Sequence, residues 1–266
     1  MKTINLNTGQ NIRFTLFPDN QPHVTVDGVE ARDQVRVICA ITDSVKLIQL
    51  LETANALKHL DAVKKILTIP YLMAARYDRL MLAGDSFDLE VIANLVNSCD
   101  FEKVQVLDVH SEVALQLINN AENINNRFLV EQYDKQEAVL ICPDKGAAKK
   151  IADYTSWNSR LKDVVYCTKS RDLSTGKITL LVEKPEECFN KNCVIIDDIC
   201  DGGATFLAIA SQIKPAHLSL IVTHGIFSKG FAALSEKFDE IITSDSLCKV
   251  YNTQKLRTIK IGYDHL

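Results

Sequence analysis

Apolar runs of strand length alternate with segments of helical period along this chain of 266 residues, and this alternation restricts the possible folds most strongly. The first apolar runs lie at 35–41, 65–71, 103–109 and 138–143. Helices are predicted between them at Ser44–Leu60, Asp88–Ser98 and Val113–Asn119, the first capped by Asp43 or Ser44. Strands that alternate with helices indicate mainly parallel sheets with crossover helices, so the predicted class is α/β.

A polar stretch at about 120–136 interrupts this pattern, and a second series of apolar runs follows it. These runs read AVLICP, DVVYCTK, CVIIDD, LSLIVTH and EIITS. We therefore predict two tandem α/β domains of one plan, residues 1–134 and 135–266, each a mainly parallel sheet flanked by helices. A short last strand is predicted near 256–261, with the N-terminal domain as one place for it to pack.

The composition excludes several classes of protein. The chain has 30 basic and 34 acidic residues and no basic run, which argues against general nucleic-acid binding. No stretch approaches the roughly 18 apolar residues of a membrane span, and the start has no apolar leader, so cytoplasm is the expected location. The eight cysteines show neither CxxC nor Cys/His metal spacing, and we expect reduced core residues.

The string VIIDDICDGGAT, residues 194–205, carries the strongest functional pattern. An apolar strand ends in Asp197 and Asp198, where open α/β sheets place ligands, and successive strand side chains point to opposite faces. One carboxylate could therefore face a sugar diol while its neighbour braces the loop. The following glycine turn opens a predicted helix whose free N–H groups would cradle a phosphate. The plainer interpretation is a solvated helix cap.

This string resembles the phosphoribosyl-diphosphate loop of type I phosphoribosyltransferases, in which two acidic residues precede Asp-Thr-Gly-Gly-Thr. The matching residues are Asp201, Gly202, Gly203, Ala204 and Thr205. Gly202 replaces the first Thr and removes a hydroxyl expected to contact the 5-phosphate. Backbone donors would then carry more of that binding.

Five further strings resemble the ribose-phosphate diphosphokinase family, in the family's order and over nearly the whole chain. They are FPDNQPHVTV at 17–26, IPYLMAARYDRL at 69–80, VLDVHSEVALQ at 106–116, CPDKGAAKKIA at 142–152 and the trio Lys169-Ser170-Arg171. The resemblance implies two phosphoribosyltransferase-like domains. It also implies a mobile arm at 169–176.

The resemblance assigns roles to residues. ATP would be bound by Phe17, Asp19, Gln21, Arg76, Asp78 and His110. Asn20, Gln21 and Tyr77 stand where the family has Gly, Glu and Gln, although Asn also tolerates a left-handed turn. His110 and Asp144 match positions associated with Mg²⁺, the implied cofactor. Without the family context, Arg76 and Asp78 would be a surface ion pair, His110 a structural histidine and Asp144 a helix cap.

The implied reaction transfers the diphosphoryl group of ATP to the anomeric hydroxyl of ribose 5-phosphate and releases AMP. Lys169 and Arg171 would supply catalytic cations. Ribose 5-phosphate would be bound by Asp197, Asp198, Asp201, Gly202, Gly203, Ala204 and Thr205. At least a homodimer is expected, because in the family the Phe17 segment reaches the ATP site of a neighbouring subunit. A type I phosphoribosyltransferase and a non-catalytic regulatory relative are the alternatives.

Overall fold

The computed structural model describes residues 1–134, 137–161, 163–171 and 178–263 and divides the chain into two compact units. Unit 1 is Met1–Asn125 with Ser246–Cys248, and unit 2 is Asn126–Asp245 with the segment from Lys249 onward. The division therefore precedes the predicted boundary at 134. The reason is that Leu129, Val130 and Tyr133 are buried in the core of unit 2.

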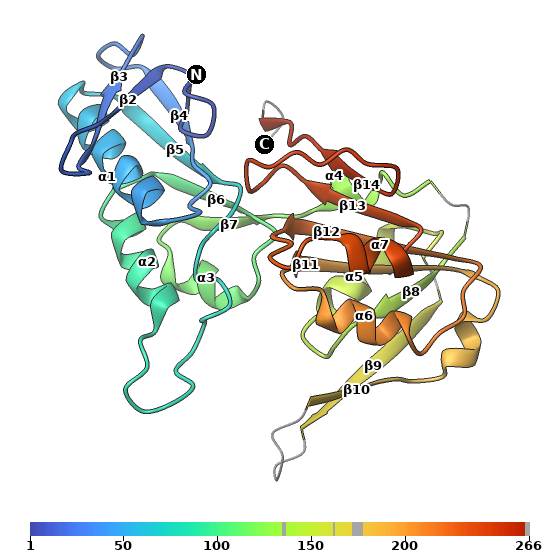
Figure 1. Ribbon diagram of the computed structural model, residues 1–266. Helices are drawn as coiled ribbons and strands as arrows, with labels where there is room; N and C mark the ends of the chain where they lie inside the picture. Colours follow the sequence, from blue (N-terminus) through green and yellow to red (C-terminus); the bar gives the residue numbers. More distant parts are fainter. Residues whose placement is uncertain (135–136, 162, 172–177, 264–266) are drawn as a thin grey trace. The chain divides into compact units, whose positions relative to one another are not determined.

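Unit 1 is built on a five-stranded parallel sheet of order β1-β4-β5-β6-β7 (Figure 1). Its strands are β1 (Lys2–Asn5), β4 (Gln34–Ile38), β5 (Val63–Ile69), β6 (Lys103–Leu107) and β7 (Ala121–Ile124). Its helices are α1 (Ser44–His59), α2 (Asp88–Asn97) and α3 (Glu112–Leu117). The predicted cap is confirmed, since the Asp43 carboxylate accepts the Lys46 N–H at 2.9 Å.

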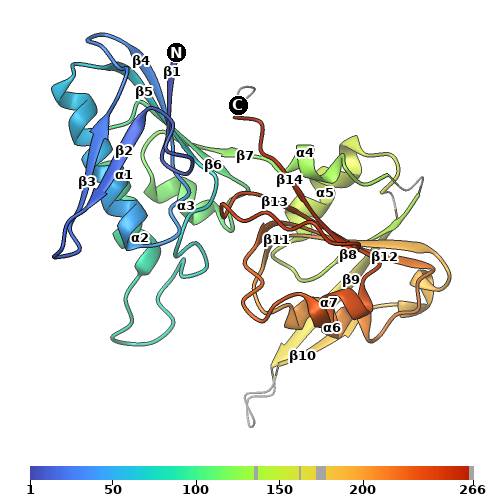
Figure 2. The same ribbon diagram turned by 45° about the horizontal axis from the view of Figure 1, so that its top comes forward.

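An antiparallel hairpin accompanies this sheet. It consists of β2 (Ile12–Leu16) and β3 (Pro22–Val26), and β3 packs beside α1 (Figure 2). The hairpin was not predicted, because β2 buries only its first residue and shows little contrast between its two faces.

Unit 2 is built on a seven-stranded sheet of order β10-β9-β8-β11-β12-β13-β14. The strands are β8 (Val139–Cys142), β9 (Val164–Arg171), β10 (Ile178–Val182), β11 (Asn192–Cys200), β12 (His217–Gly225), β13 (Glu240–Ser244) and β14 (Leu256–Ile259). All neighbours run parallel except β9 and β10, which form a projecting hairpin (Figure 1). The helices are α4 (Arg127–Val130), α5 (Ala148–Trp157), α6 (Ala204–Ala210), α7 (Ala232–Lys237) and the short 3-10 helix η1 (Pro185–Cys188).

The predicted α/β class is confirmed, with helices flanking mainly parallel sheets in both units. The last strand corrects one expectation: β14 pairs with β13 and so belongs to the sheet of unit 2. The polar stretch at 120–136 holds two short elements, β7 and α4, that the apolar pattern did not reveal. Within the described residues, no helix combines the length and apolarity needed to cross a membrane.

Strand β11 explains how the sheet positions the acidic pair. Cys193 and Ile195 pack in the cluster that holds Phe206 and Ile209 of α6, whereas Val194 and Ile196 pack in the cluster on the opposite face. That second cluster contains residues of α5, Ile151 and Tyr154. The strand is therefore buried on both faces, as expected for an inner strand of a parallel sheet.

Candidate active site

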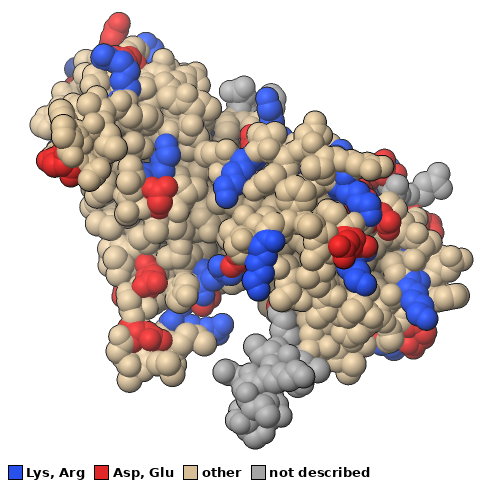
Figure 3. All heavy atoms as spheres, in the orientation of Figure 1, with Lys and Arg blue, Asp and Glu red and all other residues tan. Residues whose placement is uncertain are grey.

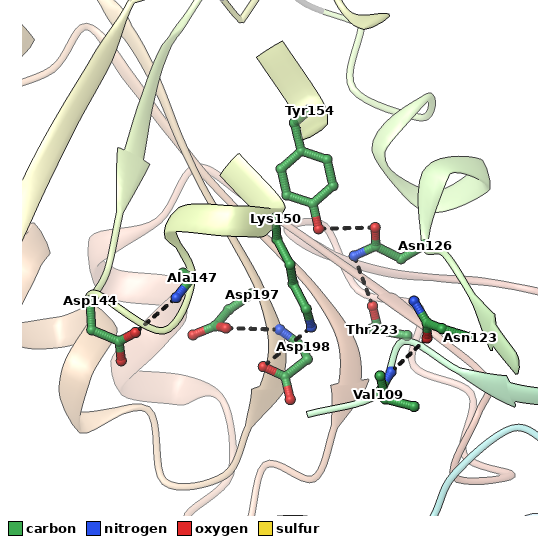
Figure 4. Close-up of polar contacts among 10 residues, drawn as sticks. All are labelled: Val109, Asn123, Asn126, Asp144, Ala147, Lys150, Tyr154, Asp197, Asp198 and Thr223. Atoms are coloured by element: carbon green, nitrogen blue, oxygen red, sulfur yellow. Dashed lines mark hydrogen bonds and ion pairs between the residues drawn. The ribbon is translucent and has the colours of Figure 1, made fainter. Parts of the chain in front are cut away.

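Asp197 and Asp198 lie near the carboxyl end of β11 and continue its alternation. The Asp198 side chain reaches Lys150 on α5, with 3.8 Å between Nζ and Oδ1. Asp197 Oδ1 accepts the Asp198 N–H at 2.9 Å, so the first carboxylate also holds the backbone of the second (Figure 4). Asp198 is 6% exposed and Asp197 half-buried, which leaves Asp197 the more accessible carboxylate.

The carboxyl group of Asp197 is held in an unfavourable environment for a negative charge. Burial raises its pKa well above the ordinary value, and repulsion from Asp198 and, more weakly, from Asp144 raises it further. Three carboxylates thus gather at one end of the sheet in unit 2. Such a site favours ligands that bring hydroxyl donors or a cation.

A buried hydrogen-bond chain lies beside Lys150. Tyr154, one helical turn further along α5, donates its hydroxyl to Asn126 Oδ1 at 3.0 Å. Asn126 in turn donates from Nδ2 to Thr223 Oγ1 of β12 at 3.1 Å (Figure 4). The chain links the first residue of unit 2 to α5 and β12, and so supports the helix that carries Lys150.

The turn from Asp201 to Thr205 connects β11 to α6. Gly203 adopts φ +76°, a left-handed conformation that costs a residue with a side chain about 1–2 kcal/mol. A Cβ at Gly203 would also lie 3.0 Å from Leu234 Cδ2 of α7. Ala204 and Thr205 form the first turn of α6, which has only seven residues.

Asp144 follows β8 and holds the turn that leads into the next helix. Its Oδ1 accepts the Ala147 N–H at 3.1 Å, directly before α5 begins. The N-cap of α5 is Ala147, without a side-chain capping bond, so Asp144 holds the turn before the helix and does not cap it. Its other carboxylate oxygen is not used in this bond, and repulsion from Asp144 contributes to the raised pKa of Asp197.

Lys169 and Arg171 lie on β9, in the hairpin with β10. In the backbone register, Lys169 pairs with Leu180 and Arg171 with Ile178. Most of the predicted arm, residues 172–176, lies outside the described residues. The structure thus places the backbone of both residues on the β9–β10 hairpin of unit 2.

The predicted ATP residues lie in unit 1. Phe17, Asp19 and Gln21 form the tip of the β2–β3 hairpin, where the Phe17 N–H donates to the Gln21 carbonyl at 2.9 Å. Asn20 has φ +66°, which agrees with the prediction that Asn tolerates the left-handed turn. Phe17 is 45% exposed at this tip.

The other predicted ATP residues of unit 1 lie on two loops. Arg76 and Asp78 lie on the long loop between β5 and α2, and Asp78 Oδ1 is 3.5 Å from Arg79 Nε. His110 is exposed just after β6. Arg76 and His110 both make further contacts within the protein.

The site combines expected and unexpected residues. The structure brings Asp144, Asp197 and Asp198 together in unit 2. Sequence reasoning assigned no role to Lys150, although its spacing of four residues from Tyr154 puts both on one helix face. On the face shown in Figure 3, basic and acidic side chains are interspersed, so this face carries no large patch of one charge.

Comparison with known proteins supports a single class. No protein-family model matches the chain. A ribose-phosphate pyrophosphokinase of Hyphomonas neptunium is 24% identical over 261 residues, covering 92% of this chain and 82% of the relative. The enzyme of the same name from Pyrococcus furiosus is 24% identical over 250 residues, covering 89% and 86%.

A solved structure shares the whole fold. The phosphoribosylpyrophosphate synthetase of Mycobacterium smegmatis matches with a TM-score of 0.79 at 17% identity, over 94% of this chain and 85% of that one. Two mainly parallel α/β units, as in that synthetase, define the fold class, and the acidic strand end and the glycine turn lie in the second unit. Similarity over most of the length points to one kind of relative: the chain is similar to ribose-phosphate pyrophosphokinases over 92% and 89% of its residues, at 24% identity.

Proposed function

We propose that this protein is a ribose-phosphate diphosphokinase that transfers the β,γ-diphosphoryl group of ATP to the anomeric hydroxyl of ribose 5-phosphate. The observation that carries the proposal is the acidic end of β11 followed by the glycine turn, in a chain similar over most of its length to ribose-phosphate pyrophosphokinases. Neither a type I phosphoribosyltransferase nor a non-catalytic relative is favoured by these relatives.

The residues of unit 2 would bind the acceptor sugar. Asp197 and Asp198 would hold the ribose diol, with Asp198 positioned by Lys150 at 3.8 Å. The turn from Asp201 to Thr205 would hold the 5-phosphate. Deprotonation of Asp197 becomes easier once hydroxyl donors bind it, because hydrogen bonds to the charged form lower a pKa.

ATP would be bound by residues of unit 1. Phe17, Asp19, Gln21, Arg76, Asp78 and His110 are the proposed ATP residues. Because Phe17 is exposed at a hairpin tip, it is free to contact a second subunit, and assembly into at least a dimer stays a prediction. Cytoplasmic location also stays a prediction.

Magnesium fits the carboxylates that are present. Mg²⁺ takes oxygen ligands, keeps several waters and commonly uses one or two carboxylates together with substrate phosphates. The Asp144 carboxylate of unit 2 is one proposed ligand, and His110 of unit 1 is proposed to act through water. Bound magnesium would neutralise charge on the diphosphoryl oxygens, while Lys169 and Arg171 would stabilise the charge that spreads over them in the transition state.

One assay tests the proposal. The protein is incubated with Mg·ATP and ribose 5-phosphate, and AMP and phosphoribosyl diphosphate are followed together. Equal amounts of both products are expected from the native chain, and Lys169→Ala should lose most of the rate. Lys214→Ala, which removes an exposed lysine before β12, is the matched control. A native rate no greater than that of Lys169→Ala would reject the proposal.

A further inference from the structure

The turn between β12 and α7 places a lysine directly over the sugar-phosphate loop. A Cβ built at Gly202 would lie 3.3 Å from Lys229 Cδ, 3.4 Å from Cε and 3.6 Å from Cγ. The aliphatic part of Lys229 therefore occupies the space that a side chain at 202 would enter. Because Nζ is one bond beyond Cε, the ammonium lies within about 5 Å of that Cβ position.

Backbone contacts hold the lysine turn against the loop. The N–H groups of Ile226 and Phe227 both donate to the carbonyl of Cys200, at 2.9 and 3.1 Å, immediately before Asp201. The turn itself is closed by the Gly230 N–H, which donates to the Phe227 carbonyl at 2.8 Å. These bonds fix the start of the lysine turn relative to the start of the glycine turn.

Side chains add to this anchoring. Phe227 is 6% exposed and packs edge-on against Phe231 and Tyr251, with ring centroids 6.4 and 5.5 Å apart. Leu234 packs against Gly203, the next residue of the glycine turn. In contrast, Lys229 itself is exposed, and no partner for its ammonium is found in the part of the chain that the structure describes.

We propose that Lys229 binds the 5-phosphate of the acceptor sugar and takes over the task of the hydroxyl that Gly202 lacks. The inference rests on the proposed function, because it names a further residue of the same sugar site. A Thr at 202 would carry its hydroxyl one bond beyond the Cβ, within the space that Lys229 now fills. An ammonium gives a phosphate dianion a charge-assisted contact, which is stronger than one neutral hydroxyl bond.

Lys229→Gln tests the proposal, because Gln keeps much of the stem and removes the charge. Lys214→Gln is the matched control: Lys214 is an exposed lysine of unit 2 that precedes β12, whereas Lys229 follows it. In Lys229→Gln, the KM for ribose 5-phosphate should rise roughly tenfold to hundredfold, as expected for one lost charge-assisted bond, with the KM for ATP nearly unchanged. Lys214→Gln should alter neither constant.

Calorimetric binding separates this proposal from the proposed function. Lys229→Gln should weaken ribose 5-phosphate binding but leave the binding of unphosphorylated ribose unchanged, a split that a purely structural role would not produce. If the native chain forms AMP and Lys229→Gln keeps the native KM, the role of Lys229 is wrong while the function stands. If the native chain forms no AMP, the function is wrong, and calorimetry alone decides on Lys229. The role of Lys229 would then be overturned if the native chain and Lys229→Gln bound ribose 5-phosphate with equal affinity, or if the native chain did not bind it.

A double substitution tests whether the ammonium replaces the hydroxyl. Gly202→Thr combined with Lys229→Ala removes the crowding and restores the hydroxyl. The double variant should bind ribose 5-phosphate more tightly than Lys229→Ala alone. Equal affinities would refute the replacement.

Discussion

Lys150→Met should destabilise unit 2 by removing a cation beside the buried Asp198 carboxylate. The 3.8 Å between Nζ and Oδ1 corresponds to a gross attraction of about 4 kcal/mol at an effective dielectric constant near 20. Lys150 keeps 26% of its side chain exposed and Asp198 only 8%, so the lysine loses part of its hydration and the carboxylate most of it. The separation exceeds hydrogen-bond distance, which makes a net loss of about 2 kcal/mol the expected result.

Urea unfolding followed by circular dichroism measures this loss. Lys149→Met is the control, because Lys149 neighbours Lys150 on α5 but is exposed, and its free energy of unfolding should change by less than about 0.5 kcal/mol. In the double variant Lys150→Met with Asp198→Asn, the buried negative charge is removed together with the cation, so most of the loss should be recovered. Equal stability of the two single lysine variants, or no recovery in the double variant, would refute the reasoning.

Three further predictions concern the same strand end and turn. Asp198→Ala should raise the KM for ribose 5-phosphate far more than the KM for ATP in steady-state kinetics, and an equal rise in both would contradict its assignment to the diol. Gly203→Ala should lower the free energy of unfolding more than Gly230→Ala: both glycines have positive φ, but only Gly203 would meet Leu234, and left-handed backbone alone costs about 1–2 kcal/mol. Asp197→Asn should stabilise the fold at neutral pH. The folded-state pKa of Asp197 lies above 3.8, so the buried carboxyl lowers the free energy of unfolding as pH rises above that value. The stabilisation by Asn should therefore grow from pH 4 to 7 in urea titrations. It should vanish below pH 4.

The sequence predicted the inner strands well, because they are buried on both faces and appear as continuous apolar runs. The run EIITS coincides with β13, and CVIIDD lies within β11. Peripheral strands were missed where burial is one-sided or slight. β2 exposes four of its five residues, and β7 has no fully buried residue, so neither shows a clear pattern.

The sequence predicted those parts of the site that lie close together in the chain. The two adjacent carboxylates and the glycine turn follow one strand, and alternation along that strand separates the two side chains. The pairing of Asp198 with Lys150 and the packing of Lys229 on Gly202 depend on neighbouring strands of the sheet. Residues far apart in the sequence meet there, and no local pattern encodes which of several lysines does so.

The contact between Gly202 and Lys229 also limits how this site can change during evolution. If position 202 gains a side chain first, that side chain is crowded by Lys229. If Lys229 is lost first, the loop has neither the ammonium nor a hydroxyl to bind phosphate. Each single step is therefore costly if the site must keep its affinity for phosphate. Related chains should accordingly vary at these two positions together, with glycine at 202 accompanying lysine at 229, and threonine at 202 accompanying a small residue there.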